Sequence, residues 1–209
     1  MSAKGVKINI QANNNPKKYP LEEKQLIQLL KEGNNQAFRA IVDQWKDMVY
    51  NTCLGILQQV TEAEDVTQEV FVQVYESIHN FKGDSKFSTW LYRIAVTKSL
   101  DQLRKKKRKK RFGFVQSLFG NNEEELNLTE NFYHPGIAME NKERAAMLFK
   151  AIEKLPENQR VAFVLHKVEG QSYMEIAEIM DVSLSSIESL MHRAKMNLRK
   201  ILADYYKAS

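Results

Sequence analysis

The sequence predicts an all-α protein of two small helical domains joined by a flexible linker. On both sides of a central segment, apolar residues recur at steps of three and four, the spacing of helices that bury one face. No alternating run of apolar and polar residues is long enough to propose a strand. The central segment, residues 121–141, has five glutamates, no lysine or arginine, and both Pro135 and Gly136. This composition predicts a linker, and the expected division is a tail at 1–20, a domain at 21–111, the linker at 112–141 and a domain at 142–209.

The first domain should begin with a short amphipathic helix over residues 21–31, ended by Gly33. A longer helix follows, and one stripe of residues at helical spacing predicts its buried face: Phe38, Ile41, Trp45, Met48, Thr52 and Ile56. Cys53 lies beside this stripe, so we expect it to pack in the core rather than to act as a nucleophile. Because it is the single cysteine, it forms no internal disulfide.

The next helix is expected to start at a capping box formed by Thr61 and Glu64. One half of this helix is apolar: Val66, Val70, Phe71, Val74, Tyr75 and Ile78. The other half is mostly polar and carries Asp65, Gln68, Glu69, Val72 and Glu76. No histidine, cysteine or third acid joins Asp65 and Glu69 to make an acid-base site, so this face is either a solvated surface or a contact for a basic protein partner.

The last helix of the first domain is expected to open after Gly83, with Asp84 or Ser85 as its cap. Most of its apolar residues share one face, and three lie off that face: Trp90, Tyr92 and Val96. Such a helix is either buried on two sides or keeps aromatic residues at the surface for a ligand.

The positive charge of the chain is concentrated at the end of this helix. Nine basic residues and one acid lie between residues 98 and 111, so this segment carries +8 although the net charge is +5. Eight consecutive basic residues, starting at Arg104, predict affinity for a polyanion. The run continues a helix that bears Trp90, Tyr92 and Arg93, which favours single-stranded nucleic acid, because unpaired bases stack on rings and the backbone needs positive charge. The alternative for the two aromatic residues is plain core packing.

In the second domain, helices are expected over residues 143–155 and 158–168. A short helix at 172–180, a tight turn and a helix at 184–199 capped by Ser183 then have helix-turn-helix spacing. This predicts a winged-helix-like DNA-binding domain. Small polar and basic side chains that suit the major groove lie opposite the core-facing residues of its second helix: Ser185, Ser189 and His192, flanked by Glu188, Arg193 and Lys195. The alternative is an ordinary solvated helix face.

Other classes of protein find little support in the sequence. The longest uncharged stretch of the front half, residues 48–61, is shorter than the roughly 20 apolar residues of a membrane span. The N-terminus has no apolar segment of a secretory signal. The four histidines show no metal-ligand spacing. We therefore expect a cytoplasmic protein with no membrane span, no metal or other cofactor and no small-molecule substrate.

Two linked sets of motifs resemble the extracytoplasmic-function (group 4) sigma factors of the sigma-70 family of bacterial RNA polymerase. Before the linker stand EAEDVTQEVFVQVY and FKGDSKFSTWLYRIAVTKSLDQLRK, and after it stands LPENQRVAFVLHKVEGQSYMEIAEIMDVSLSSIESLMHRAKMNLRK. The resemblance covers about residues 37–202, with both domains in the family's order. It implies a protein with no catalysis of its own that binds core RNA polymerase, recognises promoter DNA, helps to open it and is controlled by an anti-sigma factor.

The resemblance also implies three sites. Asp65, Gln68 and Glu69 match the surface that docks on the polymerase clamp helices, and residues 151–168 match the part that meets the flap. The match to the segment that captures the non-template strand of the minus-ten element consists of Phe87, Trp90, Arg93, Thr97, Lys98 and Arg104. The match to the recognition helix for the minus-thirty-five element consists of Ser185, Ser186, Glu188, Ser189, His192 and Arg193.

The chain departs from the family's common pattern at a few positions. Thr97 stands where many members have asparagine, and Glu188 and Leu190 stand where basic residues are frequent. A carboxylate in the major groove can accept a hydrogen bond from a cytosine amino group, so Glu188 is a candidate reader of cytosine.

Two rival functions differ in what they require. A stand-alone helix-turn-helix regulator would bind its operator unaided as a dimer, with a ligand-sensing front domain, and would leave the Asp65 face without a role. An enzyme acting on nucleic acid would need paired carboxylates, a metal cluster or a phosphate-binding glycine loop, none of which the sequence contains.

Overall fold

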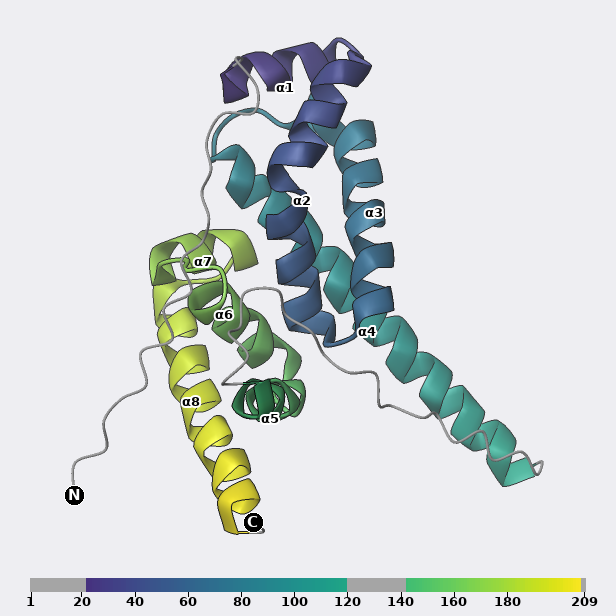
Figure 1. Ribbon diagram of the computed structural model, residues 1–209, viewed down its shortest axis with the longest axis vertical. Helices are drawn as coiled ribbons and strands as arrows, with labels where there is room; N and C mark the ends of the chain where they lie inside the picture. The colour runs from purple at the N-terminus through teal and green to yellow at the C-terminus, as the bar shows by residue number, and fades with distance from the viewer. Residues whose placement is uncertain (1–21, 120–141, 208–209) are drawn as a thin grey trace.

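The computed structural model describes residues 22–119 and 142–207, and within these ranges the chain is helical without a strand (Figure 1). This confirms the all-α prediction. The elements in chain order are α1 (Glu23–Lys31), α2 (Asn35–Leu57), α3 (Val60–Ser77), the short 3-10 helix η1 (Ile78–Asn80), α4 (Phe87–Phe119), α5 (Lys142–Glu153), α6 (Glu157–Lys167), α7 (Tyr173–Met180) and α8 (Leu184–Lys207).

The helix starts differ from the predicted ones where the connecting turns are tight. α2 begins after Asn34, whose side-chain oxygen accepts hydrogen bonds from the N–H groups of Gln36 at 2.9 Å and Ala37 at 3.1 Å. The capping box predicted at Thr61 is wrong. Gln58, with φ of 59°, and the extended Gln59 complete the turn from α2, so α3 has already begun at Val60.

The predicted caps of α4 are also wrong. Gly83 turns the chain with φ of 84°, and the two predicted caps, Asp84 and Ser85, lie in the bend that follows. The first hydrogen bond of helical i to i+4 type in this segment joins the N–H of Trp90 to the carbonyl of Lys86 at 3.2 Å. The helix therefore begins at Phe87.

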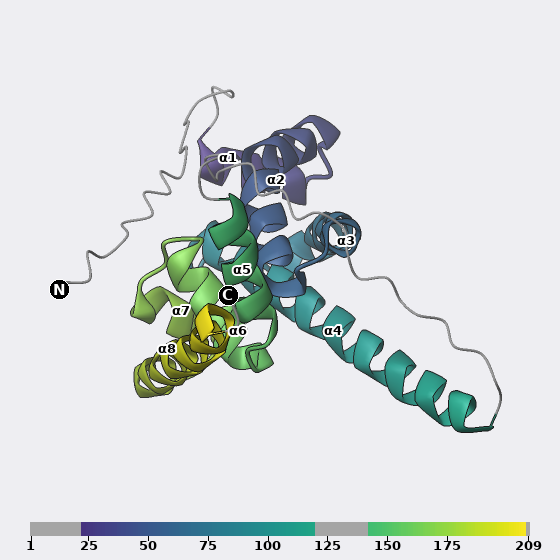
Figure 2. The same ribbon diagram turned by 60° about the horizontal axis from the view of Figure 1, so that its bottom comes forward.

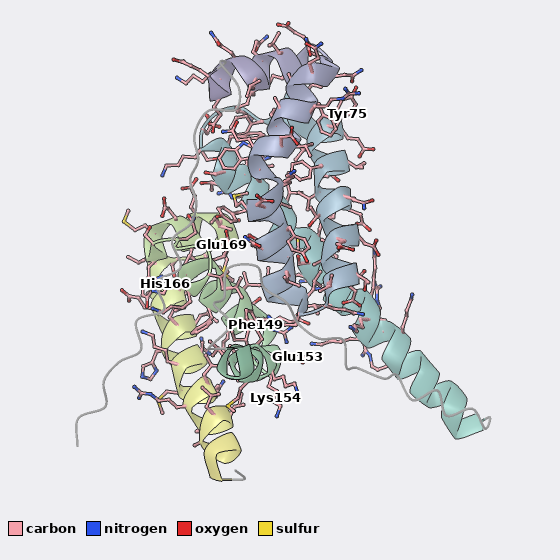
Figure 3. The ribbon with its side chains drawn as sticks, in the orientation of Figure 1. Tyr75, Phe149, Glu153, Lys154, His166 and Glu169 are labelled. Carbon is pink, nitrogen blue, oxygen red and sulfur yellow. The ribbon has the colours of Figure 1, made fainter. Side chains whose placement is uncertain are left out.

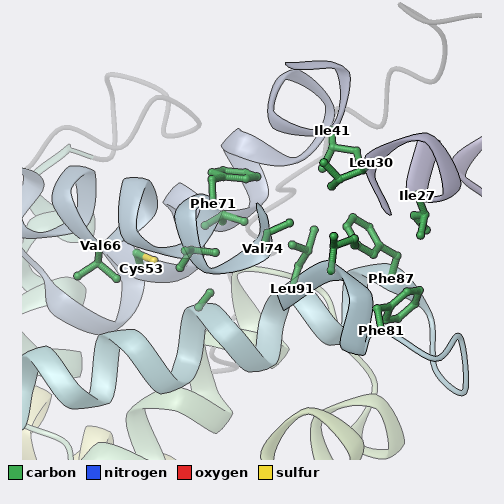
Figure 4. Packing of buried hydrophobic residues seen from close by; sticks show 14 of the residues in the cluster. Ile27, Leu30, Ile41, Cys53, Val66, Phe71, Val74, Phe81, Phe87 and Leu91 are labelled. Atoms are coloured by element: carbon green, nitrogen blue, oxygen red, sulfur yellow. The ribbon is translucent and has the colours of Figure 1, made fainter. Parts of the chain in front are cut away.

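Helices α1 to α4 enclose the first apolar core (Figure 4). Cys53 lies fully inside it, where burial raises the pKa of its thiol to about 11, so the expected packing role is confirmed. The predicted stripe of α2 is buried at Ile41, Thr52 and Ile56 and half-buried elsewhere. Tyr75, expected on the inward half of α3, is instead 44% exposed. Its ring makes an edge-to-face contact with the ring of Phe38, with centroids 5.2 Å apart.

Helices α5 to α8 form the second domain and contain the predicted helix-turn-helix. Ser172 and Glu175 cap α7 reciprocally, and Asp181 ends it in the left-handed region with φ of 53°. The hydroxyl of Ser183 accepts a hydrogen bond from the N–H of Ser186 at 3.2 Å and so caps α8 as predicted. α8 continues beyond the expected end at residue 199 to Lys207.

The two domains pack directly against each other. Ile56 of α2 and Tyr92 and Val96 of α4 belong to the same buried cluster as the apolar residues of α5 to α8. α4 is therefore buried on two sides at Tyr92 and Val96, whereas Trp90 is only half-buried. The far end of α4 projects away from both domains (Figures 1 and 2).

The end of α4 also reaches further than expected. The helix continues to Phe119, eight residues into the segment predicted as linker. Lysine and arginine have high helix propensity, which favours this continuation. The rest of the predicted linker, residues 120–141, and the tail at 1–20 lie outside the described residues.

Candidate protein and nucleic-acid interfaces

The outer face of α3 presents the three residues predicted to dock a protein. Asp65, Gln68 and Glu69 are all exposed, and Val66 and Val70 on the opposite side hold the helix against the core. Glu69 also reaches across to α4, where its carboxylate lies 3.7 Å from the ammonium group of Lys98.

Sequence reasoning placed Val72 on this outer face but gave it no role. The side chain is 55% exposed and lies one helical turn after Gln68 and Glu69. Glu76 follows it on the same face and is exposed as well. An apolar group bordered by carboxylates resembles the arrangement of protein interfaces, in which an apolar centre has a polar rim. The face therefore suits a partner helix with basic residues around an apolar contact.

The predicted strand-capturing residues of α4 do not all reach the surface. At about 100° per residue, Trp90, Arg93, Thr97 and Arg104 fall on one face of the helix. Thr97 and Arg104 are exposed and Trp90 is half-buried. We call these four residues the capture face.

Phe87 and Lys98 lie outside the capture face. Phe87 is 1% exposed, and its ring packs against Trp45, Phe81 and Trp90, with centroids 5.7 Å apart for the last pair. In this arrangement the buried Phe87 ring packs against the indole of Trp90 and is not accessible to a base. Lys98 is turned toward α3 by its ion pair with Glu69.

The second domain contacts one edge of the capture face. The guanidinium of Arg93 donates two hydrogen bonds to the carbonyl oxygen of Glu178, from Nε at 3.1 Å and Nη2 at 2.8 Å. This carbonyl is in the last turn of α7, where the helix dipole attracts cations, and it also accepts a long hydrogen bond of 3.4 Å from the N–H of Asp181. Seven residues before Arg93, Lys86 directly precedes α4 and pairs with Glu175 at 3.0 Å. Arg93 is therefore already bound within the chain.

A buried polar group holds the two domains together beside Arg93. The hydroxyl of Tyr92 donates to the carboxylate of Glu169 at 3.0 Å, and the side-chain amide of Gln171 donates to the same hydroxyl at 3.3 Å. Glu169 lies at the seam between the two domains (Figure 3). Burial raises the pKa of the Glu169 carboxyl to about 7, although the hydrogen bond from Tyr92 opposes this rise. Sequence reasoning missed this group, because Tyr92 and Glu169 stand 77 positions apart.

Glu175 has the opposite electrostatic environment. Its carboxylate accepts hydrogen bonds from the N–H of Ser172, from the ammonium group of Lys86 and from the hydroxyl of Ser172, in that order of importance, and these lower its pKa to about 2. The same side chain thus caps α7 and contacts the first domain.

The basic run after the capture face is anchored only at its beginning. Lys106 pairs with Glu62 of α3 at 3.0 Å, and Lys107 pairs with Glu157 of α6 at 2.7 Å. The other described side chains beyond Arg104 are exposed and have no ion-pair partner: Lys105, Arg108, Lys109 and Arg111. Positive charge on every side of an exposed helix suits the sequence-independent binding of phosphates.

The recognition face of α8 is exposed as predicted, with one exception. Ser185, Glu188, Ser189, His192 and Arg193 are exposed, whereas Ser186 is half-buried. The hydroxyl and the N–H of Ser186 both bond to Ser183, at 2.8 and 3.2 Å, so Ser186 serves the helix cap. We call the five exposed residues the recognition face.

Neither a metal site nor a membrane span is found in the part of the chain that the structure describes. Across residues 22–119 and 142–207, no three histidine, cysteine, aspartate or glutamate side chains gather as metal ligands. No helix within these ranges is long and apolar enough to cross a bilayer.

The two helical domains, with a helix-turn-helix in the second and an exposed basic run at the end of α4, define the class of an all-α DNA-binding protein. Comparison with known families agrees, because Sigma-70 region 2 matches residues 41–109 and Sigma-70 region 4 matches residues 145–198. The chain is 35% identical to the ECF RNA polymerase sigma factor SigW of Bacillus subtilis over 185 residues, which are 87% of this chain and 97% of that protein. It is 31% identical to the ECF RNA polymerase sigma-E factor of Escherichia coli, over 84% of this chain and 91% of the relative.

The chain belongs to the extracytoplasmic-function sigma factors of the sigma-70 family. It is a promoter-directing transcription initiation factor and not an enzyme.

Two solved structures share the fold. CnrH in complex with the cytosolic domain of CnrY superposes with a TM-score of 0.62 at 22% identity, over 87% of this chain and 97% of that one. The sigma factor RpoE of Bartonella quintana, in complex with the anti-sigma factor NepR, superposes with a TM-score of 0.59 at 22% identity, over 79% of this chain and 96% of that one.

Proposed function

We propose that three separate faces of this sigma factor bind three different partners or promoter elements. The outer face of α3 docks on the clamp helices of core RNA polymerase, the capture face of α4 holds the non-template strand of the minus-ten element, and the recognition face of α8 reads the minus-thirty-five element. The observation that carries the proposal is the exposure of Asp65, Gln68 and Glu69 around Val72, because a stand-alone DNA-binding regulator has no use for such a face.

The chemistry of each face supports its assignment. Acids on α3 would repel DNA and attract a basic protein helix. On α4, the half-buried indole of Trp90 offers a stacking ring to a single strand. The exposed Arg104, about 21 Å further along the same helix face, offers a phosphate contact. On α8, hydroxyl, imidazole and guanidinium groups can donate to or accept from base edges in the major groove.

Glu188 gives the recognition face a specific expectation. Its carboxylate is exposed on α8 and can accept a hydrogen bond from the amino group of a cytosine. The Glu188→Ala protein should lose preference for cytosine at one minus-thirty-five position. Unchanged preference at every position of that element would contradict this assignment.

The remaining partners are proposed from the same function. The helices of the second domain over residues 151–168 meet the polymerase flap, and an anti-sigma factor controls the chain. The two similar structures are complexes with the cytosolic domain of CnrY and with the anti-sigma factor NepR, which supports control of this kind. Because the polymerase and the chromosome are cytoplasmic, the chain acts in the cytoplasm.

Binding to core RNA polymerase tests the docking face. Wild-type chain should co-elute with core polymerase in size exclusion, and the triple variant Asp65→Ala, Gln68→Ala, Glu69→Ala should lose at least tenfold in affinity, about 1.4 kcal/mol. A matched control changes two acids and one glutamine that are exposed just after α1 and on α2, namely Glu32, Gln36 and Asp47, and should bind as the wild type does.

Two outcomes would contradict the assignment. Equal loss in the triple variant and the control would remove the specific role of the α3 face. Failure of the folded wild type to bind polymerase, together with unaided binding of a duplex operator, would favour the dimeric regulator.

A further inference from the structure

The seam between the two domains contains more than apolar packing. Arg93 of α4 donates to the carbonyl of Glu178, Lys86 pairs with Glu175, and Lys107 pairs with Glu157. At the other end of the seam, the buried guanidinium of Arg160 on α6 donates to the carbonyl of Ile56 on α2 at 2.9 Å.

The seam covers one of the three functional faces and leaves the other two open. Arg93 belongs to the capture face and has its guanidinium bound to α7. By contrast, Asp65 and Gln68 on α3 and Ser189 and His192 on α8 are exposed in the same arrangement. The closed chain can therefore present its docking and recognition faces while part of its capture face is occupied.

We propose that the closed arrangement is self-inhibited: α7 of the second domain occupies Arg93 and keeps the capture face from single-stranded DNA until the two domains separate. This inference rests on the proposed function of the capture face. It assigns the block to the chain itself, with no second protein required.

The contacts are of a kind that can be exchanged. Arg93 bonds to a neutral carbonyl, and a DNA phosphate offers the same guanidinium a charged acceptor with stronger hydrogen bonds. Lys86 is largely exposed, so its ion pair with Glu175 adds little stability. Most of the closure then rests on the apolar contact of Ile56, Tyr92 and Val96 with the second domain.

Gly55 provides a way to open the seam without weakening the first domain. It lies in α2 where that helix meets α6, and a Cβ atom placed on it would lie 2.6 Å from Cγ1 of Val164. Val164 is fully buried and β-branched, so it cannot rotate away freely. Within α2 itself, alanine is a better helix former than glycine. Gly55→Ala should therefore separate the domains and leave α2 intact.

The experiment compares the shape of the full chain with its affinity for single-stranded DNA. Small-angle scattering reports closure, and fluorescence anisotropy reports binding of a labelled 12-nucleotide oligothymidine, a probe that stacking and phosphate contacts bind without sequence preference. We expect a compact wild type. Gly55→Ala should be more extended and bind the oligonucleotide about tenfold more tightly or better, because affinity scales with the open fraction.

Two double variants serve as controls. Adding Val164→Ala to Gly55→Ala removes the methyl group that clashes and should restore both the compact shape and the weak binding. Adding Arg93→Ala to Gly55→Ala should abolish most of the gain in binding while the chain stays extended. If Gly55→Ala does not fold, Tyr92→Phe is the second opening variant, because it leaves the Glu169 carboxyl buried without the donor it has in the seam.

Each result supports or overturns the inference. A wild type that is already extended, or an opened variant that binds no more tightly than the wild type, overturns it. A gain in binding that persists without Arg93 also overturns it, because the gain would then come from elsewhere. Failure of the proposed capture function would instead appear in the polymerase-bound protein, where changing Trp90 and Arg104 to alanine would leave opening of the minus-ten element unchanged. This measurement does not depend on closure of the free chain.

Discussion

Arg160 connects three helices, and its removal should destabilise the chain more than any surface change. Its side chain is 7% exposed. Nη1 donates to the carbonyl of Ile56 at 2.9 Å, and Nη2 donates to the carbonyls of Glu153 and of Leu155, the latter at 3.3 Å. The carbonyls of Ile56 and Glu153 lie in the last turns of α2 and α5, and that of Leu155 lies just beyond α5. Carbonyl groups at helix C-termini have no intrahelical donor.

The magnitude of the Arg160→Met change follows from these contacts. Methionine keeps most of the volume and removes both donor nitrogens together with their three hydrogen bonds. A hydrogen bond to a charged group contributes about 1.5–3 kcal/mol, and a buried acceptor left without a donor costs about 1–3 kcal/mol. Burial of the guanidinium, which also lowers its pKa, offsets part of this gain in the wild type. We therefore expect a net loss of about 3–4 kcal/mol in the free energy of unfolding.

Urea unfolding of the full chain, followed by circular dichroism, measures this loss. Arg199→Met is the matched control, because Arg199 is exposed on α8 and its replacement should change stability by less than about 0.5 kcal/mol. A loss below about 1 kcal/mol for Arg160→Met, or equal losses for both variants, would refute the reasoning that Arg160 joins the helix ends.

Three further predictions concern single side chains. Asn34→Ala removes the acceptor for two N–H groups of α2 and should cost about 1 kcal/mol in urea unfolding, whereas a similar loss for the exposed neighbour Asn35→Ala would contradict the capping role. Ser172→Ala should lower the thermal stability of the second domain by about 1 kcal/mol and raise the pKa of Glu175 from about 2, which NMR titration can follow. The pKa of Glu169 is raised, so its contribution to closure is present below pH 4.5 and is lost as pH rises through about 7. The loss is at most about 3 kcal/mol, and Glu169→Gln should flatten this pH dependence in small-angle scattering; an unchanged slope would exclude Glu169 as its source.

Local patterns in the sequence were sufficient for the helices and for two of the three faces. The polar half of α3 and the polar side of α8 can be recognised from helical periodicity alone. When the apolar residues of a helix are buried along one stripe, the polar residues of the same helix must lie on the opposite, exposed face. The confirmed cap at Ser183 is equally local, since donor and acceptor are three residues apart. Helix starts were less predictable where a left-handed residue such as Gln58 or Gly83 decided the turn.

The capture face shows what periodicity could not decide. Trp90, Tyr92 and Val96 depart from the main apolar stripe of α4, and the sequence left open whether this second set of apolar groups meets a ligand or another part of the chain. The answer depended on long-range packing, since Tyr92 and Val96 pack on the second domain and Arg93 bonds to α7. Phe87 was chosen for a surface role by resemblance, but three aromatic neighbours enclose it.

The sequence by itself determined the all-α class, the helix-turn-helix, the acidic face of α3 and the family, because each depends on residue type at short spacing. Only the tertiary structure decided how the two domains meet. Contacts such as Tyr92 with Glu169 and Gly55 with Val164 join residues that are 77 or more positions apart. No periodicity encodes such pairs, since they form only when two independently folded surfaces gain more by burying each other than by remaining in water.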